Sequence, residues 1–143
     1  MKTLIVLIIL ASAMLLNAEP IEHGSWVSIT TTDVMTDDVS ELVFSLVDGA
    51  AIIFMNESRV VIDADRIVSS RGELLIRLDT QDARLYEYVA DGSLAVLRDA
   101  RPSDFIDAEI IRARVPLVRG NQVYSWSTDG LREAFERFGW SVD

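Results

Sequence analysis

The 143-residue chain has no cysteine, one histidine and, at position 2, its only lysine. Without cysteine it can have no disulfide, no thiol nucleophile and no thiolate metal site. Every arginine lies after residue 58, and 13 basic residues stand against 23 acidic ones, for a formal net charge of −10. Nucleic acid and anionic lipid both select clustered basic residues, so a chain this acidic is a poor candidate for either ligand.

Long hydrophobic runs are also absent, except for one near the N-terminus. Residues 4–16 are almost uninterrupted apolar residues, Lys2 precedes them and Ala18 follows. This is the three-part layout of a secretory signal peptide. The run is shorter than the roughly 20 residues that span a bilayer, although an uncleaved anchor stays open as an alternative. We expect cleavage after Ala18, which leaves one periplasmic or secreted domain at 19–143 without stable membrane insertion.

From residue 25 onward the apolar residues recur mostly at every second position. The runs are short and rich in β-branched and aromatic residues, as in 42–47, 74–78 and 123–126. Turn-forming residues separate them at regular intervals, and the gaps are too short for crossover helices. The sequence therefore predicts a mainly β protein, an antiparallel β-sandwich, with Trp26 and Trp126 in its core.

Two segments break this period and predict helices. The first is a short helix near Ser103–Ala108, which Ser103 is expected to cap. The second is a C-terminal amphipathic helix from about Asp129 to Phe138, begun by Thr128 or Asp129 and ended by Gly139. One face of it carries four apolar residues at helical spacing, which we expect to be buried: Leu131, Ala134, Phe135 and Phe138.

The segment from residue 104 to residue 140 carries a family resemblance. A strand ending in Ser125-Trp126-Ser127 passes through Thr128-Asp129-Gly130-Leu131 into a helix with Glu133-Ala134. This corner, with Trp26-Val27-Ser28 and the acidic turn at 35–38, resembles the exported VasI-like proteins associated with type VI secretion. The resemblance implies an exported accessory or interaction domain and no catalytic residues. Such relatives commonly carry a cysteine pair, which this chain lacks.

Four residues are candidates for a binding surface. Arg112 and Arg114 lie two positions apart, so both point to one face of a strand and can meet a carboxylate or phosphate. The alternative is that they pair across strands with acidic residues such as Glu73, Asp79 or Glu87. Tyr86 and Tyr88 share a face if their strand is regular, where they form either an exposed partner patch or part of the core.

His23 and the acidic turns are the remaining candidates for chemistry. His23 lies two residues from Ser25, but no orienting carboxylate is evident, and we expect a solvated histidine instead of a general base. The acidic turns offer oxygen ligands for calcium, although the spacing of an EF-hand is absent. They are Asp33, Asp37 and Asp38, Asp63 with Asp65, and Asp79 with Asp82.

These observations predict an exported, non-enzymatic accessory or interaction protein of the periplasm or envelope, with a role in type VI secretion implied by the resemblance. No catalytic residue, metal or cofactor is expected. The expected partner is a protein of the cell envelope, and the acidic body favours a basic surface on it. The alternative function is an ion-dependent hydrolase or a calcium-binding module that uses the acidic turns.

Overall fold

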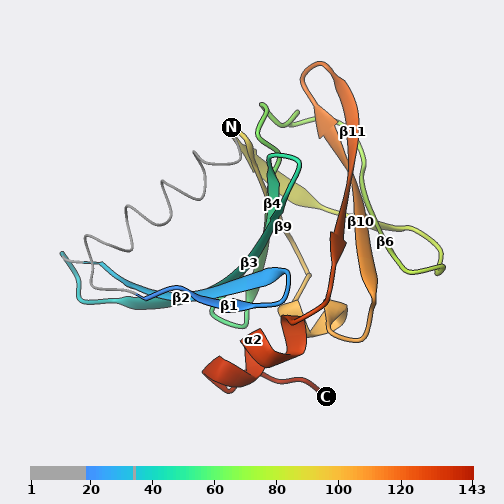
Figure 1. Ribbon diagram of the computed structural model, residues 1–143. Coiled ribbons are helices and arrows are strands. Elements are labelled where there is room, and N and C mark those ends of the chain that lie inside the picture. The colour runs from blue at the N-terminus through green and yellow to red at the C-terminus, as the bar shows by residue number, and fades with distance from the viewer. Residues whose placement is uncertain (1–18, 34) are drawn as a thin grey trace.

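The computed structural model describes residues 19–33 and 35–143. Within these residues, strands form two antiparallel sheets that face each other, and one α-helix follows the last strand (Figure 1). The predicted antiparallel β-sandwich is therefore confirmed. The predicted signal peptide, residues 1–18, lies outside the described residues. No helix in 19–33 and 35–143 is long and apolar enough to cross a membrane.

The larger sheet has seven strands in the order β1-β2-β3-β4-β5-β9-β8, and the smaller has four in the order β11-β10-β6-β7. The strands of the larger sheet are β1 (Ile21–His23), β2 (Trp26–Thr32), β3 (Val39–Val47), β4 (Ala50–Met55), β5 (Arg59–Asp63), β8 (Tyr88–Asp91) and β9 (Leu94–Leu97). The strands of the smaller sheet are β6 (Leu74–Leu78), β7 (Arg84–Tyr86), β10 (Ile110–Leu117) and β11 (Gly120–Ser127).

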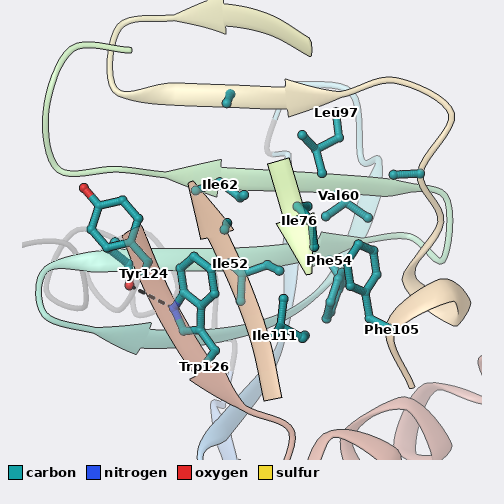
Figure 2. Close-up of a cluster of buried hydrophobic side chains, with 14 of the residues drawn as sticks. Ile52, Phe54, Val60, Ile62, Ile76, Leu97, Phe105, Ile111, Tyr124 and Trp126 are labelled. Carbon is teal, nitrogen blue, oxygen red and sulfur yellow. Dashed lines mark hydrogen bonds between the residues drawn. The ribbon is translucent and has the colours of Figure 1, made fainter. Parts of the chain in front are cut away.

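The core lies between the two sheets (Figure 2). Most strands contribute alternate side chains to it, because successive residues of a strand point to opposite faces. Ile52, Phe54 and Ile62 come from the larger sheet and meet Ile111 and Trp126 of the smaller one (Figure 2). Trp26 and Trp126 are both fully buried, as the sequence predicts.

The chain changes sheets between β7 and β8. Tyr86 ends β7 in the smaller sheet, and Tyr88 begins β8 in the larger sheet. Only Glu87 separates the two strands, so this residue marks the crossing. The apolar alternation of residues 85–89 predicts a single strand, but the chain here serves two sheets.

The first predicted helix is a short 3₁₀ turn, η1 (Pro102–Phe105). Ser103 lies inside this turn and does not cap it, contrary to the prediction. The Asp104 carboxylate accepts the backbone N–H of Arg101 at 2.9 Å instead. Phe105 and Ile106 are buried beneath the sheets, as expected for residues that anchor such a turn.

The C-terminal helix is α2 (Leu131–Phe138), which lies across one end of the sandwich (Figure 1). It begins at Gly130, which has a positive φ of 86°, and neither Thr128 nor Asp129 provides a side-chain cap. It ends as predicted at Gly139, whose N–H bonds to the carbonyl of Glu136 at 3.0 Å. On its inner face Leu131, Ala134 and Phe135 are fully buried, whereas Phe138 is only partly buried at the rim of the core.

Candidate functional site

The outer face of the smaller sheet gathers the two predicted arginines on one surface. On β10, Ile111, Ala113 and Val115 are fully buried, so Arg112 and Arg114 point away from the core. The register places Arg77 of β6 directly opposite Arg112. We call this surface the arginine face, and it consists of Arg77, Arg112 and Arg114 with the apolar neighbours Leu75, Leu85 and Val123.

The arginines of this face have no carboxylate partner among the described residues. Arg112 Nη1 donates to the backbone carbonyl of Asp79 at 3.3 Å, and Arg77 Nη2 donates to that of Thr80 at 3.4 Å. Within the described residues the ion pair found is Arg132 with Asp107, elsewhere on the molecule. The alternative of cross-strand ion pairs with Glu73, Asp79 or Glu87 is therefore not realised here.

The carboxylate of Asp79, at the end of this face, bonds to backbone groups and not to the arginines. Its Oδ1 accepts the backbone N–H groups of Glu109 and Ile110, both at 2.9 Å. These bonds tie the start of β10 to the turn that follows β6. Arg77 and Arg112 are thus two like charges on adjacent strands, held by carbonyl oxygens and not neutralised. Such a pair favours an external anion, because an added negative charge relieves their repulsion.

Exposed apolar side chains border the arginines. Leu85 and Val123 are each 56% exposed, and Leu75 between them is half-buried. In register, Leu75 lies opposite both Leu85 and Arg114, and Arg114 lies opposite Val123. One row across the four strands therefore reads Leu85, Leu75, Arg114, Val123. Arginine beside exposed aliphatic groups is typical of protein contact surfaces.

The two predicted tyrosines do not form a common patch, because they belong to different sheets. Tyr86 points inward and is buried, with the Arg84 guanidinium 5.0 Å from its ring centre. Tyr88 is half-buried and donates its hydroxyl to the carbonyl of Ser69 at 2.6 Å. Burial raises the pKa of both phenols above the ordinary value. Tyr86 is therefore part of the core, and Tyr88 fixes a loop.

His23 is part of a structural link and not a solvated terminus. It lies in β1, and its Nε2 is 2.8 Å from the Oγ of Ser28, not from Ser25. Arg137 of α2 donates to the Oγ of Ser28 at 2.6 Å and to its carbonyl at 2.8 Å. Ser28 is fully buried, so its hydroxyl has no access to a substrate. The three side chains join the first two strands to the last helix.

The acidic turns use their carboxylates locally. Asp33 accepts the backbone N–H of Met35 at 2.7 Å, and Asp63 accepts that of Asp65 at 3.2 Å. This is the usual role of aspartate in turns. In the part of the chain that the structure describes, no group of three or more histidine or acidic residues is placed to hold a metal ion.

The sequence reasoning missed Arg77, Leu85 and Val123. Arg77 could have been found, since it interrupts an apolar strand between Ile76 and Leu78 in the way that Arg112 interrupts β10. Its position opposite Arg112 follows only from the strand order, in which β6 pairs with β10 although residues 79–109 lie between them. Leu85 and Val123 carry no sequence signal that separates an outward apolar residue from an inward one.

A hollow lies at the tip of the β10–β11 hairpin. It has a volume of about 570 Å³ and is lined by Arg66, Ile67, Leu117, Val118 and Arg119. Ile67 and Val118 are 65% and 63% exposed, and the N–H of Val118 bonds to the carbonyl of Ile67 at 3.0 Å. Among the described residues, no buried side-chain nitrogen or oxygen atom lacks a hydrogen-bond partner, so nothing in this hollow points to a polar ligand.

Comparison with known proteins finds no significant match to a protein-family model, to a curated protein or to a solved structure.

Proposed function

We propose that the protein is an exported, non-enzymatic interaction domain of the periplasm or cell envelope that binds an acidic surface of a protein partner through the arginine face. The observation that carries this proposal is the set of outward arginines, Arg77, Arg112 and Arg114, without carboxylate partners among the described residues. They stand out in a chain whose formal net charge is −10. The narrower assignment, a role in type VI secretion, rests on the sequence resemblance, mainly that of the C-terminal corner.

The arginine face revises the expected partner chemistry. The overall charge favours a basic partner, but the field at a contact depends on the nearest charges, because salt screens interactions beyond about 10 Å at 0.1 M ionic strength. The charged residues within β6, β10 and β11 are all arginines: Arg77, Arg112 and Arg114. An acidic partner surface is therefore steered to this side and repelled by the rest of the molecule, which fixes its orientation.

Crosslinking in the native envelope tests the proposal. The double variant Arg112→Glu/Arg114→Glu reverses the charge of the face and should abolish capture of the partner seen with the unaltered protein. Arg59→Glu is the matched control, because Arg59 is an exposed strand arginine of the larger sheet. Arg59→Glu should capture the partner as well as the unaltered protein does. Equal capture by the double variant and by the unaltered protein would discard the arginine face as the contact.

Export is tested separately. Intact-mass measurement of the protein from its native host should give a chain that begins at Glu19. Recovery of a chain that retains Met1 in the membrane fraction would replace export with an anchored form.

A further inference from the structure

The last strand, β11, ends the smaller sheet, and no other strand of the described residues pairs with its outer edge. The N–H of Thr128 donates to the carbonyl of Glu109 at 3.0 Å, which makes these two residues a hydrogen-bonded pair of the antiparallel ladder. Hydrogen-bonding direction alternates along a strand, so even-numbered residues of β11 face β10. The backbone N–H and carbonyl groups of Asn121, Val123 and Ser125 therefore point away from the sheet.

This edge lacks the features that protect sheet edges from pairing. β11 has eight residues, whereas β1 and β7 at other edges have three each and β8 has four. It contains no proline and no charged residue, both of which commonly block edge pairing. The C-terminal end of β11 is closed, because Trp26 Nε1 donates to the carbonyl of Ser127 at 2.9 Å. Asn121, Val123 and Ser125 are all exposed.

We propose that β11 binds an acidic, extended segment of another protein, which adds to the smaller sheet as a further antiparallel or parallel strand. The proposal rests on the proposed function and specifies the form of the partner. Strand addition supplies main-chain hydrogen bonds, and alternate side chains supply specificity. Every second side chain of the added strand lies on the arginine face, beside Val123 and Ser125.

The arginines select an acidic segment. An added strand lies about 10 Å from β10, which is two strand spacings, and long side chains bridge that distance. Arg112 and Arg114 on β10 can then reach glutamate or aspartate side chains of the segment. A second copy of this chain is a poorer occupant, because its own β11 offers no acidic residue and each copy carries a net charge of −10.

Peptide binding to the purified protein tests the proposal. The probe is the acetylated and amidated peptide Glu-Thr-Glu-Val-Glu-Thr-Glu, with its lysine counterpart, Lys-Thr-Lys-Val-Lys-Thr-Lys, as the charge control. The acidic peptide should bind, its affinity should fall as salt rises, and it should shift the amide signals of Asn121, Val123 and Ser125 in a nuclear magnetic resonance titration. The lysine peptide should bind at least tenfold more weakly.

Two variants separate the edge from the charge. Val123→Pro removes an N–H that points to solvent, so the pairing with β10 persists while the edge is blocked. It should lower affinity at least tenfold relative to Val123→Thr, which changes the same side chain but keeps the N–H. Arg114→Gln should also weaken binding, and Arg59→Gln on the other sheet should not. A thermal melt of Val123→Pro close to that of Val123→Thr shows that the fold is retained.

The proposal would be overturned by no binding of the acidic peptide, by equal binding by Val123→Pro and Val123→Thr, or by a concentration-dependent dimer that Val123→Pro abolishes. The last outcome assigns the edge to a second copy. Partner capture that depends on Arg112 and Arg114 but survives Val123→Pro would keep the proposed function and remove strand addition.

Discussion

Gly130 packs directly against the backbone of His23 and Gly24. Its φ is +86°, and a Cβ atom there would lie 1.9 Å from the carbonyl oxygen of His23. The backbone segments at Gly130 and at His23 cannot easily move apart. Gly24 packs against Asp129 in the same corner, and the N–H of Ser25 bonds to the Asp129 carbonyl at 3.0 Å. The corner between β11 and α2 therefore depends on the absence of a side chain.

Gly130→Ala should lower the free energy of unfolding by about 3 kcal/mol, since overpacking adds to the strain of a positive φ. Gly139→Ala is the matched control: its φ is +69°, but a Cβ there meets no atom within 4 Å. Gly139→Ala should lower the free energy of unfolding by only about 1 kcal/mol, because the strain of the positive φ is the only cost. Urea denaturation of both variants measures the difference, and equal losses would mean that the contact with His23 is not restrictive.

Tyr124 and Tyr88 predict how stability changes at alkaline pH. Each donates its hydroxyl to a backbone carbonyl, that of Ala64 at 2.8 Å and that of Ser69 at 2.6 Å, and burial raises the pKa of each above 10.0. The native state thus keeps protons that the unfolded chain loses. This contribution to stability is complete below pH 10.0 and is lost as the pH rises from there through the native pKa.

The midpoint of urea unfolding should consequently fall as the pH is raised from 9 to 11. Tyr124→Phe removes one of the titrating groups, so its midpoint should fall less steeply over the same range. A slope identical to that of the unaltered protein would show that the Tyr124 phenol does not titrate differently in the two states.

At the scale of elements, α2 is stabilised mainly by the burial of one face. Phe135 is fully buried and touches two other rings, those of Phe54 at 5.5 Å and Trp140 at 5.2 Å between centroids. The helix has eight residues, which is too short to be stable without such packing. Its place on the sandwich therefore depends on this aromatic cluster.

Phe135→Ala should lower the free energy of unfolding by about 3 to 5 kcal/mol, the usual cost of truncating a buried phenylalanine. Glu136→Ala, one position further on the exposed side of the same helix, should change it by less than about 0.5 kcal/mol. Chemical denaturation followed by tryptophan fluorescence measures both. A small loss for Phe135→Ala would mean that the helix packs loosely against the sheets.

The sequence predicts strands well where one face is buried and the other is wet. β10 is the best case, because Ile111, Ala113 and Val115 alternate with Arg112 and Arg114 and the sheet follows this pattern. The prediction from alternation fails at residues 85–89, where the same pattern spans two strands that belong to different sheets. Nothing local distinguishes the two cases, since the crossing depends on which strands pair with β7 and β8.

The candidate site shows the same division between local and long-range information. That Arg112 and Arg114 share a face follows from a two-residue spacing. Strand order and register, in contrast, decide that Arg77 joins them. They also decide that no ion pair with these arginines forms among the described residues. The N-cap of α2 was mispredicted for a related reason: Thr128 donates its hydroxyl to the carbonyl of Ala108, a residue distant in sequence.

At the scale of the whole molecule, repulsion between acidic residues is the main electrostatic feature. The net charge is −10, and the ion pair found within the described residues, Arg132 with Asp107, is largely exposed, so salt has little favourable pairing to weaken. Added salt should therefore stabilise the fold by screening the repulsion.

The melting temperature should rise by a few degrees between about 10 mM and about 100 mM sodium chloride, because the screening length falls from about 30 Å to about 10 Å over that range. It should change little at higher concentrations. A melting temperature that falls with salt would mean that favourable charge pairs dominate, and a steady rise into the molar range would point to salting-out in place of screening.

The contacts that close one end of the sandwich join residues about a hundred positions apart. Trp26 bonds to the carbonyl of Ser127 across 101 positions, Arg137 reaches Ser28 across 109, and Trp140 Nε1 donates to Glu41 at 2.7 Å across 99. The hairpins of β2, β3 and β4 can form early, but their inner face has no cover until β10, β11 and α2 arrive. Folding should be slow for a domain of this size, because distant pairings carry a large loop-closure entropy. A chain emerging gradually from a ribosome or a membrane pore would expose this apolar face throughout, and it is then that aggregation competes most strongly with folding.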